Sequence, residues 1–147
     1  MIDLDVQSAT RAWTPLSADF QRWVEAALHG RRDAAELAIR LVDEAESQQL
    51  NQHYRDKDAP TNVLSFPADL PEGVELALLG DLVICAPIVA AEAADQGKTA
   101  LAHWAHLTIH GTLHLLGFDH ISSVDAERME GEERLVLADL GYRDPYS

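Results

Sequence analysis

The sequence of 147 residues is short of cysteine, of basic side chains and of long apolar runs. Its single cysteine, Cys85, excludes an internal disulfide. No apolar run approaches the length that crosses a bilayer, and the N-terminal residues lack the basic start and apolar stretch of a signal peptide. We therefore expect a soluble protein of a reducing compartment, the cytoplasm, without a membrane partner.

Basic side chains are outnumbered, because 11 Lys and Arg against 25 Asp and Glu give a net charge of -14. The excess is concentrated in residues 61–147, which carry 14 acidic and 4 basic side chains. Broad binding of nucleic acids or anionic membranes needs a cationic surface. Composition alone therefore argues against a nucleic-acid partner, and we expect no binding to DNA.

Apolar residues, at 47% of the chain, suffice to build one core over residues 1–147. Alternation with period two predicts strands, and apolar spacings of three to four predict helices. The predicted strands are 2–7, 37–42, 63–66 and 76–84, the predicted helices are 17–28, 43–54, 86–96, 99–116 and 123–140, and loops are predicted at 55–62 and 68–75. Ser17 and Asp43 are predicted N-caps, and Gly80 is predicted to mark a bulge or a close backbone approach. The pattern predicts a single α+β domain, in which a small mixed sheet of about four strands packs with about five helices.

The segment from His110 to His120 has the spacing H-x-x-x-H-x-x-G-x-x-H. Residues four apart lie on one face of a helix, so His110 and His114 can bind the same ion. Gly117 allows a sharp turn that brings His120 to that ion. Three neutral imidazoles leave one coordination position open, as in catalytic zinc sites. The spacing therefore predicts one metal ion per chain, on a long helix and the turn that follows it.

The sequence lacks the glutamate that would act as general base in the histidine motif. Metzincin proteases share this spacing but place a glutamate after the first histidine, where this chain has Gly111. A metzincin-type protease is therefore disfavoured. Asp119 is predicted either to orient an imidazole or accept a proton, or to be an exposed turn residue. His106 is predicted either to face the substrate or support the site, or to be an interior histidine, whereas His103 is predicted to be structural.

Arg55 and Lys57 lie in a loop that contains Pro60, within a chain that has few other cations. They could bind phosphate, because a guanidinium offers planar paired donors to phosphate oxygens. Pairing with Asp56 and Asp58 is the alternative. Three further residues are predicted to belong to the core rather than to a site, namely Cys85, Trp23 and Trp104.

Four segments together resemble the YbeY family of bacterial rRNA maturation factors. They are residues 42–46 (VDEAE), 51–67 (NQHYRDKDAPTNVLSFP), 79–85 (LGDLVIC) and 110–120 (HGTLHLLGFDH). The resemblance implies a metal-dependent endoribonuclease of the bacterial cytoplasm, specific for single strands, that matures the 3′ end of 16S rRNA and acts in 70S ribosome quality control. It also implies His110, His114 and His120 as metal ligands, zinc as the usual ion, and Arg55 with His114 as catalytic residues.

The partners implied are single-stranded rRNA and ribosomes or pre-ribosomal particles. An acidic face on the last helix, comprising Glu127, Glu130, Glu132 and Glu133, is expected to meet basic ribosomal proteins or another maturation factor. Two alternatives remain open from the sequence. One is a zinc hydrolase that acts on peptides or small molecules, and the other is a zinc-containing ribosome assembly factor without catalytic activity.

Overall fold

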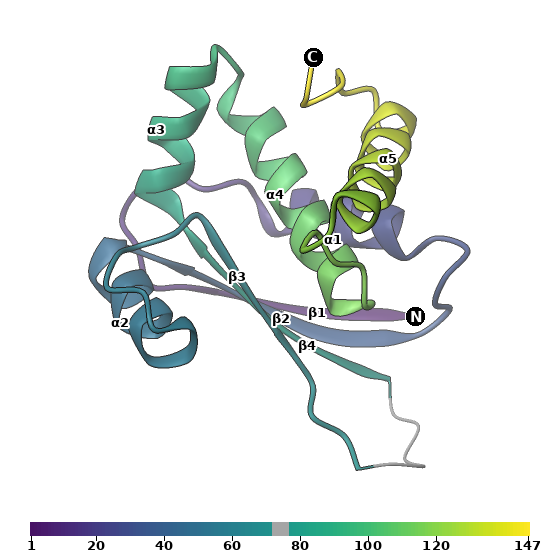
Figure 1. Cartoon of the computed structure of the whole chain (residues 1–147), viewed down its shortest axis with the longest axis horizontal. Helices are drawn as coiled ribbons and strands as arrows, with labels where there is room; N and C mark the ends of the chain where they lie inside the picture. Colours follow the sequence, from purple (N-terminus) through teal and green to yellow (C-terminus); the bar gives the residue numbers. More distant parts are fainter. Residues whose placement is uncertain (72–76) are drawn as a thin grey trace.

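Four strands and five helices succeed one another in the computed structural model, which describes residues 1–71 and 77–147 (Figure 1). Their bounds are β1 (Ile2–Ser8), α1 (Ser17–Leu28), β2 (Ala35–Val42), α2 (Glu44–Arg55), β3 (Val63–Pro67), β4 (Leu78–Cys85), α3 (Ala86–Gln96), α4 (Ala100–Leu115) and α5 (Ser123–Asp139). The predicted α+β class and number of elements are confirmed. The predicted strand start at Leu76 and much of the predicted loop 68–75 lie outside the described residues.

The strands form one mixed sheet in the order β1-β2-β4-β3. β2 pairs in parallel with β1 and β4, and β3 pairs antiparallel with β4 at the other edge. Gly80 of β4 has a φ of +141°, and a Cβ there would lie 2.2 Å from the carbonyl oxygen of Phe66. The predicted close approach at Gly80 is confirmed, because only a residue without a side chain lets β3 pass so near.

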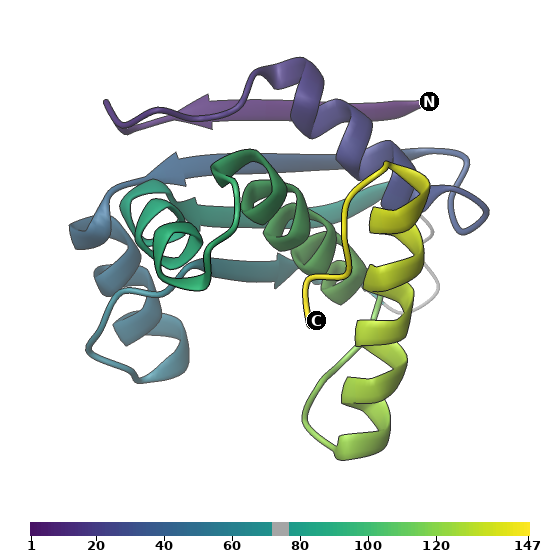
Figure 2. The ribbon, with the colours of Figure 1, turned by 90° about the horizontal axis from the view of Figure 1, so that it is seen from above.

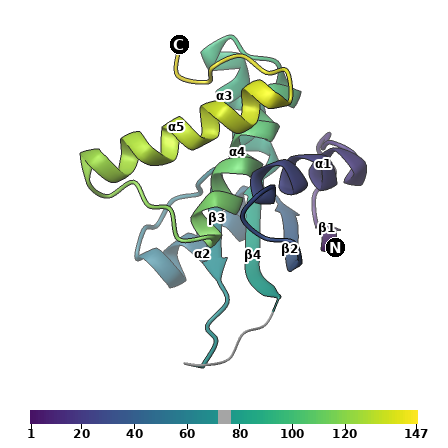
Figure 3. The ribbon, with the colours of Figure 1, turned by 90° about the vertical axis from the view of Figure 1, so that its right-hand side faces the viewer.

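The helices lie on both faces of the sheet. α1, α3, α4 and α5 gather on one face and α2 covers the other (Figures 1 and 2). α4 contacts α1, α3, α5, β3 and β4, and α5 crosses over it (Figure 3). On the α2 side, Leu50 packs against a smaller cluster that includes Val42, Leu64 and Cys85. Helix α4 is therefore enclosed by other elements along most of its length.

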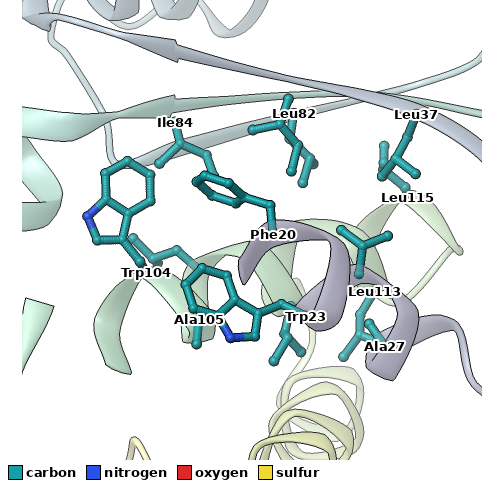
Figure 4. Packing of buried hydrophobic residues seen from close by; sticks show 14 of the residues in the cluster. Phe20, Trp23, Ala27, Leu37, Leu82, Ile84, Trp104, Ala105, Leu113 and Leu115 are labelled. Atoms are coloured by element: carbon teal, nitrogen blue, oxygen red, sulfur yellow. The ribbon is translucent and has the colours of Figure 1, made fainter. Parts of the chain in front are cut away.

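The main core lies between the sheet and helices α1 and α4 (Figure 4). Phe20 packs edge-on against Trp23 and Trp104, with ring centroids 5.5 and 5.8 Å apart. All three side chains are buried. The prediction that Trp23, Trp104 and Cys85 are core residues is confirmed, which removes Cys85 as a metal ligand.

Of the two predicted helix caps, Asp43 is confirmed as the N-cap residue and Ser17 is wrong. Leu16, not Ser17, occupies the N-cap position of α1, and the Asp19 carboxylate accepts a hydrogen bond from the Leu16 N–H at 3.0 Å. Asp43 is the N-cap of α2, but its carboxylate accepts from the Thr10 hydroxyl instead of capping the helix. At Asp43, a partner 33 residues away thus replaces the local capping bond that the sequence predicts.

No helix in the described ranges combines the length and the apolar character needed to cross a bilayer.

Candidate metal centre and substrate cleft

Helix α4 carries four histidines on neighbouring turns within an otherwise apolar, mostly buried segment. Thr99 begins the helix, since its hydroxyl accepts a hydrogen bond from the Ala102 N–H at 3.2 Å. His110 and His114, four residues apart, stand next to each other near the end of the helix, as predicted. Both are half-buried, so their imidazoles are held by the core and still reach solvent.

The chain turns directly after α4 and comes back to these histidines. Gly117 adopts a φ of +107°, which is the left-handed conformation expected of the predicted glycine turn. The turn places the ring of His120 with its centroid 5.3 Å from His110 and 5.9 Å from His114. The three histidines predicted from the sequence therefore gather at the end of α4.

Candidate metal-ligating atoms of His114, Asp119 and His120 all lie within 4.8 Å of one another. His110 lies beside this group rather than within it, and Asp119, for which the sequence left two readings open, lies inside it. Asp119 also accepts a hydrogen bond from the His120 N–H at 2.7 Å. The turn thus adds a carboxylate to the imidazoles at the site.

The hydrogen bonds of His110 and His114 fit them for binding a metal ion. Nδ1 of His114 lies 2.9 Å from the Phe118 carbonyl oxygen, and Nδ1 of His110 lies 3.1 Å from Oε2 of Glu133. Both partners are acceptors, so each Nδ1 carries the proton and each Nε2 keeps its lone pair. Burial lowers the pKa of His114, outweighing its bond to Phe118, and so favours the neutral form that binds metals. The residues at the site therefore fit a zinc ion.

Glu133 of α5 belongs to the site, although the sequence predicts it on the acidic face of the last helix. It is fully buried beneath the histidines of α4. Burial by itself raises the pKa of Glu133, but hydrogen bonds from His106 and His110 outweigh this and bring the pKa to about 2. Glu132 is half-buried and pairs with Arg31. The acidic face is therefore reduced to Glu127 and Glu130.

A sequence signal for Glu133 does exist. The buried side chains of α5 include Met129, Val136 and Leu137, which lie four residues before and three and four residues after Glu133. Glu133 therefore falls on the apolar stripe of the helix, where a carboxylate needs a buried partner. Its position on that stripe, rather than its charge, was the informative feature.

His106 lies in the interior. Its Nε2 is 2.5 Å from Oε1 of Glu133 and 3.2 Å from the Tyr146 hydroxyl. It does not line the cleft that the described residues form beside His110 and His114. His106 thus lies beside His110, with ring centroids 6.4 Å apart, and shares the Glu133 carboxylate with it.

A cleft of about 670 Å³ runs from the three histidines to the end of α2. Arg55, the last residue of α2, lines it together with His110, His114 and His120. The next residue, Asp56, has a φ of 56°, so the chain turns away immediately after Arg55. The other lining residues are Tyr54, Thr61, Asn62, Val63, Leu64, Ser65, Phe66, Pro67, Asp119 and Ile121. Helix α2 thus brings a cation into the same cleft as the metal centre.

Among the residues that the structure describes, neither Arg55 nor Lys57 forms an ion pair. Asp58 instead accepts a hydrogen bond from Gln48 at 2.8 Å. Both cations are exposed, but only Arg55 lines the cleft. The alternative in which Asp56 and Asp58 neutralise them is therefore not what the structure contains.

The wall next to Arg55 is aromatic. Tyr54 is 61% exposed and contacts the ring of Phe66 edge-on, with centroids 4.9 Å apart. Exposed aromatic rings next to cations are a common arrangement for binding unpaired bases. The cleft therefore offers a cation, an aromatic ring and a candidate metal centre within one space.

Gly111 lacks a side chain that could accept a proton, and its position on α4 is also tightly packed. A Cβ at this position would lie 2.8 Å from Cδ2 of Leu82 and 3.4 Å from Oγ of Ser65. A side chain at this position would therefore require the Leu82 side chain to move. The close approach of α4 to β4 disfavours the glutamate that follows the first histidine in metzincins.

The chain is similar to known proteins over nearly its whole length. The family model described as endoribonuclease YbeY matches residues 5–141. The chain is 60% identical to the endoribonuclease YbeY of Stutzerimonas stutzeri over 148 aligned positions, which cover 100% of this chain and 92% of that protein. It is 61% identical to the endoribonuclease YbeY of Xanthomonas oryzae, covering 93% and 88%. The solution structure of TM1509 from Thermotoga maritima is similar, with 26% identity and a TM-score of 0.59, covering 95% and 91%.

Proposed function

The chain belongs to the YbeY endoribonuclease family, and from this we propose that it is a zinc-dependent enzyme that cleaves single-stranded RNA. One observation carries the proposal: Arg55 and the histidines of the candidate metal centre line a single cleft. A phosphodiester placed there would meet a free cation and a metal centre together. Residues 1–147 would act as one catalytic domain.

We propose His110, His114 and His120 as the ligands of one zinc ion per chain. The hydrogen bonds that hold Nδ1 of His110 and of His114 support this ligand set, because they leave both Nε2 atoms free. A bound zinc ion supplies a Lewis acid that polarises a phosphoryl oxygen and lowers the pKa of a water molecule. His114 would thus take part in catalysis as a ligand.

The other catalytic roles fall to charged side chains of the cleft. Arg55 would neutralise the charge that develops on the phosphoryl oxygens in the transition state. Asp119 would accept a proton from the attacking water, which its position beside His114 and His120 supports. Lys57, two residues beyond Arg55, would bind a neighbouring phosphate. Phosphoryl transfer depends mainly on positioning and charge stabilisation, which suits a site where Gly111 replaces a glutamate.

We propose rRNA as the substrate, with maturation of the 3′ end of 16S rRNA and 70S quality control in the bacterial cytoplasm as the roles. Family membership supports this, and the exposed Tyr54 would stack on an unpaired base. Ribosomal particles would be reached through basic ribosomal proteins that meet Glu127 and Glu130. If charge reversal at both glutamates left co-sedimentation with ribosomes unchanged, that docking surface would be excluded.

The test compares His114→Ala and Arg55→Glu with the parent on a single-stranded RNA, and Arg32→Glu serves as a control because Arg32 is exposed and does not line the cleft. Both site variants should lose cleavage by about 100-fold or more, whereas the control should cleave at the parental rate. Only His114→Ala should also lose zinc. Parental rates in both site variants would refute the proposal.

The same preparations distinguish this proposal from a peptide or small-molecule hydrolase and from a non-catalytic assembly factor. Zinc-dependent cleavage of casein but not of RNA would favour a peptide hydrolase. Melting of the fold when zinc is removed, with no nuclease activity in the loaded protein, would favour an assembly factor, because a structural zinc contributes directly to folding.

A further inference from the structure

Glu133 forms the centre of a buried cluster that joins α4, α5 and the C-terminal segment. Its Oε2 lies 3.1 Å from Nδ1 of His110, and its Oε1 lies 2.5 Å from Nε2 of His106. The Tyr146 hydroxyl donates to the same Oε1 at 2.8 Å. Three donors from two other parts of the chain thus meet on one carboxylate that has no exposure to solvent.

We propose that Glu133 is a positioning residue of the metal centre, which holds the His110 imidazole with Nε2 available to zinc, and that Tyr146 in turn fixes the Glu133 carboxylate. The inference rests on the proposed function in one respect, namely that His110 is a ligand. It adds two residues, from α5 and the C-terminal segment, that do not line the cleft.

The proposed effect on His110 follows from its two ring nitrogens. A carboxylate at Nδ1 keeps the proton there, fixes the orientation of the ring and makes Nε2 a better ligand. This matters most for His110, because its donor atoms fall outside the tight group formed by His114, Asp119 and His120. The bond to Glu133 therefore determines how His110 is presented to that group.

The position of Glu133 is determined in turn by Tyr146. The tyrosine ring packs edge-on against His106, with centroids 5.3 Å apart, and the Arg134 guanidinium lies 5.0 Å from its centre. Lys98 donates to the Pro145 carbonyl oxygen at 2.8 Å and so ties the same segment to the turn before α4. The C-terminal segment is therefore held at Pro145 and at the Tyr146 ring, next to the hydroxyl that contacts Glu133.

Helix α4 contains a matched control for this arrangement. His103 is as buried as His106, and its Nε2 contacts Oε1 of Glu92 at 2.9 Å. Glu92 holds Asn62 as well, but it contacts none of the proposed ligands. Removing the Glu92 carboxylate therefore disrupts a histidine–carboxylate pair between α3 and α4, at a buried histidine, without removing a contact of His110.

The experiment measures zinc affinity by competition with a chelating dye for the full chain and for Glu133→Gln, Tyr146→Phe and Glu92→Gln. Glutamine has one acceptor oxygen, so it cannot serve both His106 and His110. Glu133→Gln should bind zinc about 10- to 100-fold more weakly. Tyr146→Phe should also lower the zinc affinity, but by a smaller factor. Glu92→Gln should leave the zinc affinity unchanged, even if the melting temperature of this variant without metal falls.

Equal zinc affinity in Glu133→Gln and the parent would overturn the inference, as would an equal loss in Glu92→Gln, which would indicate a general effect of destabilisation. If Glu133→Gln does not fold, Tyr146→Phe decides, because it keeps the carboxylate. Failure of the proposed function looks different: the parent itself would bind no zinc, or His114→Ala would bind it as tightly as the parent does.

Discussion

Two charged side chains of this region, Arg55 and Glu133, lie in opposite environments. Arg55 is exposed and unpaired among the described residues, and is therefore available to a substrate phosphate. Glu133 is buried and accepts from three donors, which compensates the cost of removing its charge from water. The exposed charge of Arg55 suits the binding of an anionic ligand, whereas the hydrogen-bonded charge of Glu133 suits holding the residues around it in place.

The ligand set can be decided by comparing two single substitutions. Because Nε2 of His110 is left free by its bond to Glu133, His110→Ala should lose most of its zinc. Asp119→Asn should retain zinc and lose cleavage activity, since an amide cannot accept a proton. Elemental analysis of the purified variants measures this. Retention of zinc by His110→Ala with loss from Asp119→Asn would instead indicate the group His114, Asp119 and His120 as the ligands.

Buried histidines should make stability depend on pH. Burial lowers the pKa of His103 despite its bond to Glu92. Below about pH 6.5, the unfolded chain therefore binds more protons than the folded one, and the free energy of unfolding falls as the pH decreases. His114 has a pKa shift of the same sign. Urea denaturation with chelator present, at pH 7.5 and 5.5, should show the decrease.

His103→Gln provides the control for the pH effect. Glutamine can still donate to Glu92 but does not titrate, so the difference between the two pH values should become smaller. An identical pH dependence in the parent and in His103→Gln would contradict the assignment.

At the scale of the element, α4 packs so closely against β4 at Gly111 that a methyl group there would displace the Leu82 side chain. Gly111→Ala should lower the free energy of unfolding by about 1–3 kcal/mol, because the new Cβ would lie 2.8 Å from Leu82. Gly131 of α5 has nothing within 4 Å of its hypothetical Cβ. Gly131→Ala should therefore raise the free energy of unfolding by up to about 1 kcal/mol through helix propensity. Urea denaturation of both variants measures the signs, and equal signs would contradict this account.

The elements and the histidine turn were predictable because they depend on local sequence. Alternation in β1, the apolar spacing of α1 and the glycine at 117 each act within a few residues. The strand order was not predictable, because it depends on pairing between distant segments such as β2 and β4. The apolar stripe of α5 indicates that Glu133 is buried, but its partners were not predictable for the same reason, since His106 and His110 lie 27 and 23 residues away. The features that could not be predicted are therefore contacts between elements that are distant in the sequence.

At the scale of the whole molecule, a net charge of -14 limits how RNA can be held. Arg55 lines the cleft and Lys57 follows two residues later, so about two phosphates should be neutralised. The logarithm of the binding constant should then fall with the logarithm of salt concentration with a slope of about -1 to -2. Fluorescence anisotropy of a short labelled single strand, with chelator present to prevent cleavage, measures this slope. A slope of -5 or steeper would require a cationic surface that the composition does not supply.

Enclosure of α4 has a consequence for how such an enzyme can diversify. The helix that carries His110 and His114 also supplies Trp104, Ile109 and Leu113 to the core. Most substitutions that alter its active face therefore also reduce folding stability, and selection can accept few of them. Residues 56–60, between the cleft residues Arg55 and Thr61, are exposed or half-buried and belong to neither hydrophobic cluster. In laboratory evolution towards other RNA substrates, productive changes should accumulate in this segment, while α4 and the turn that carries Asp119 and His120 stay nearly constant.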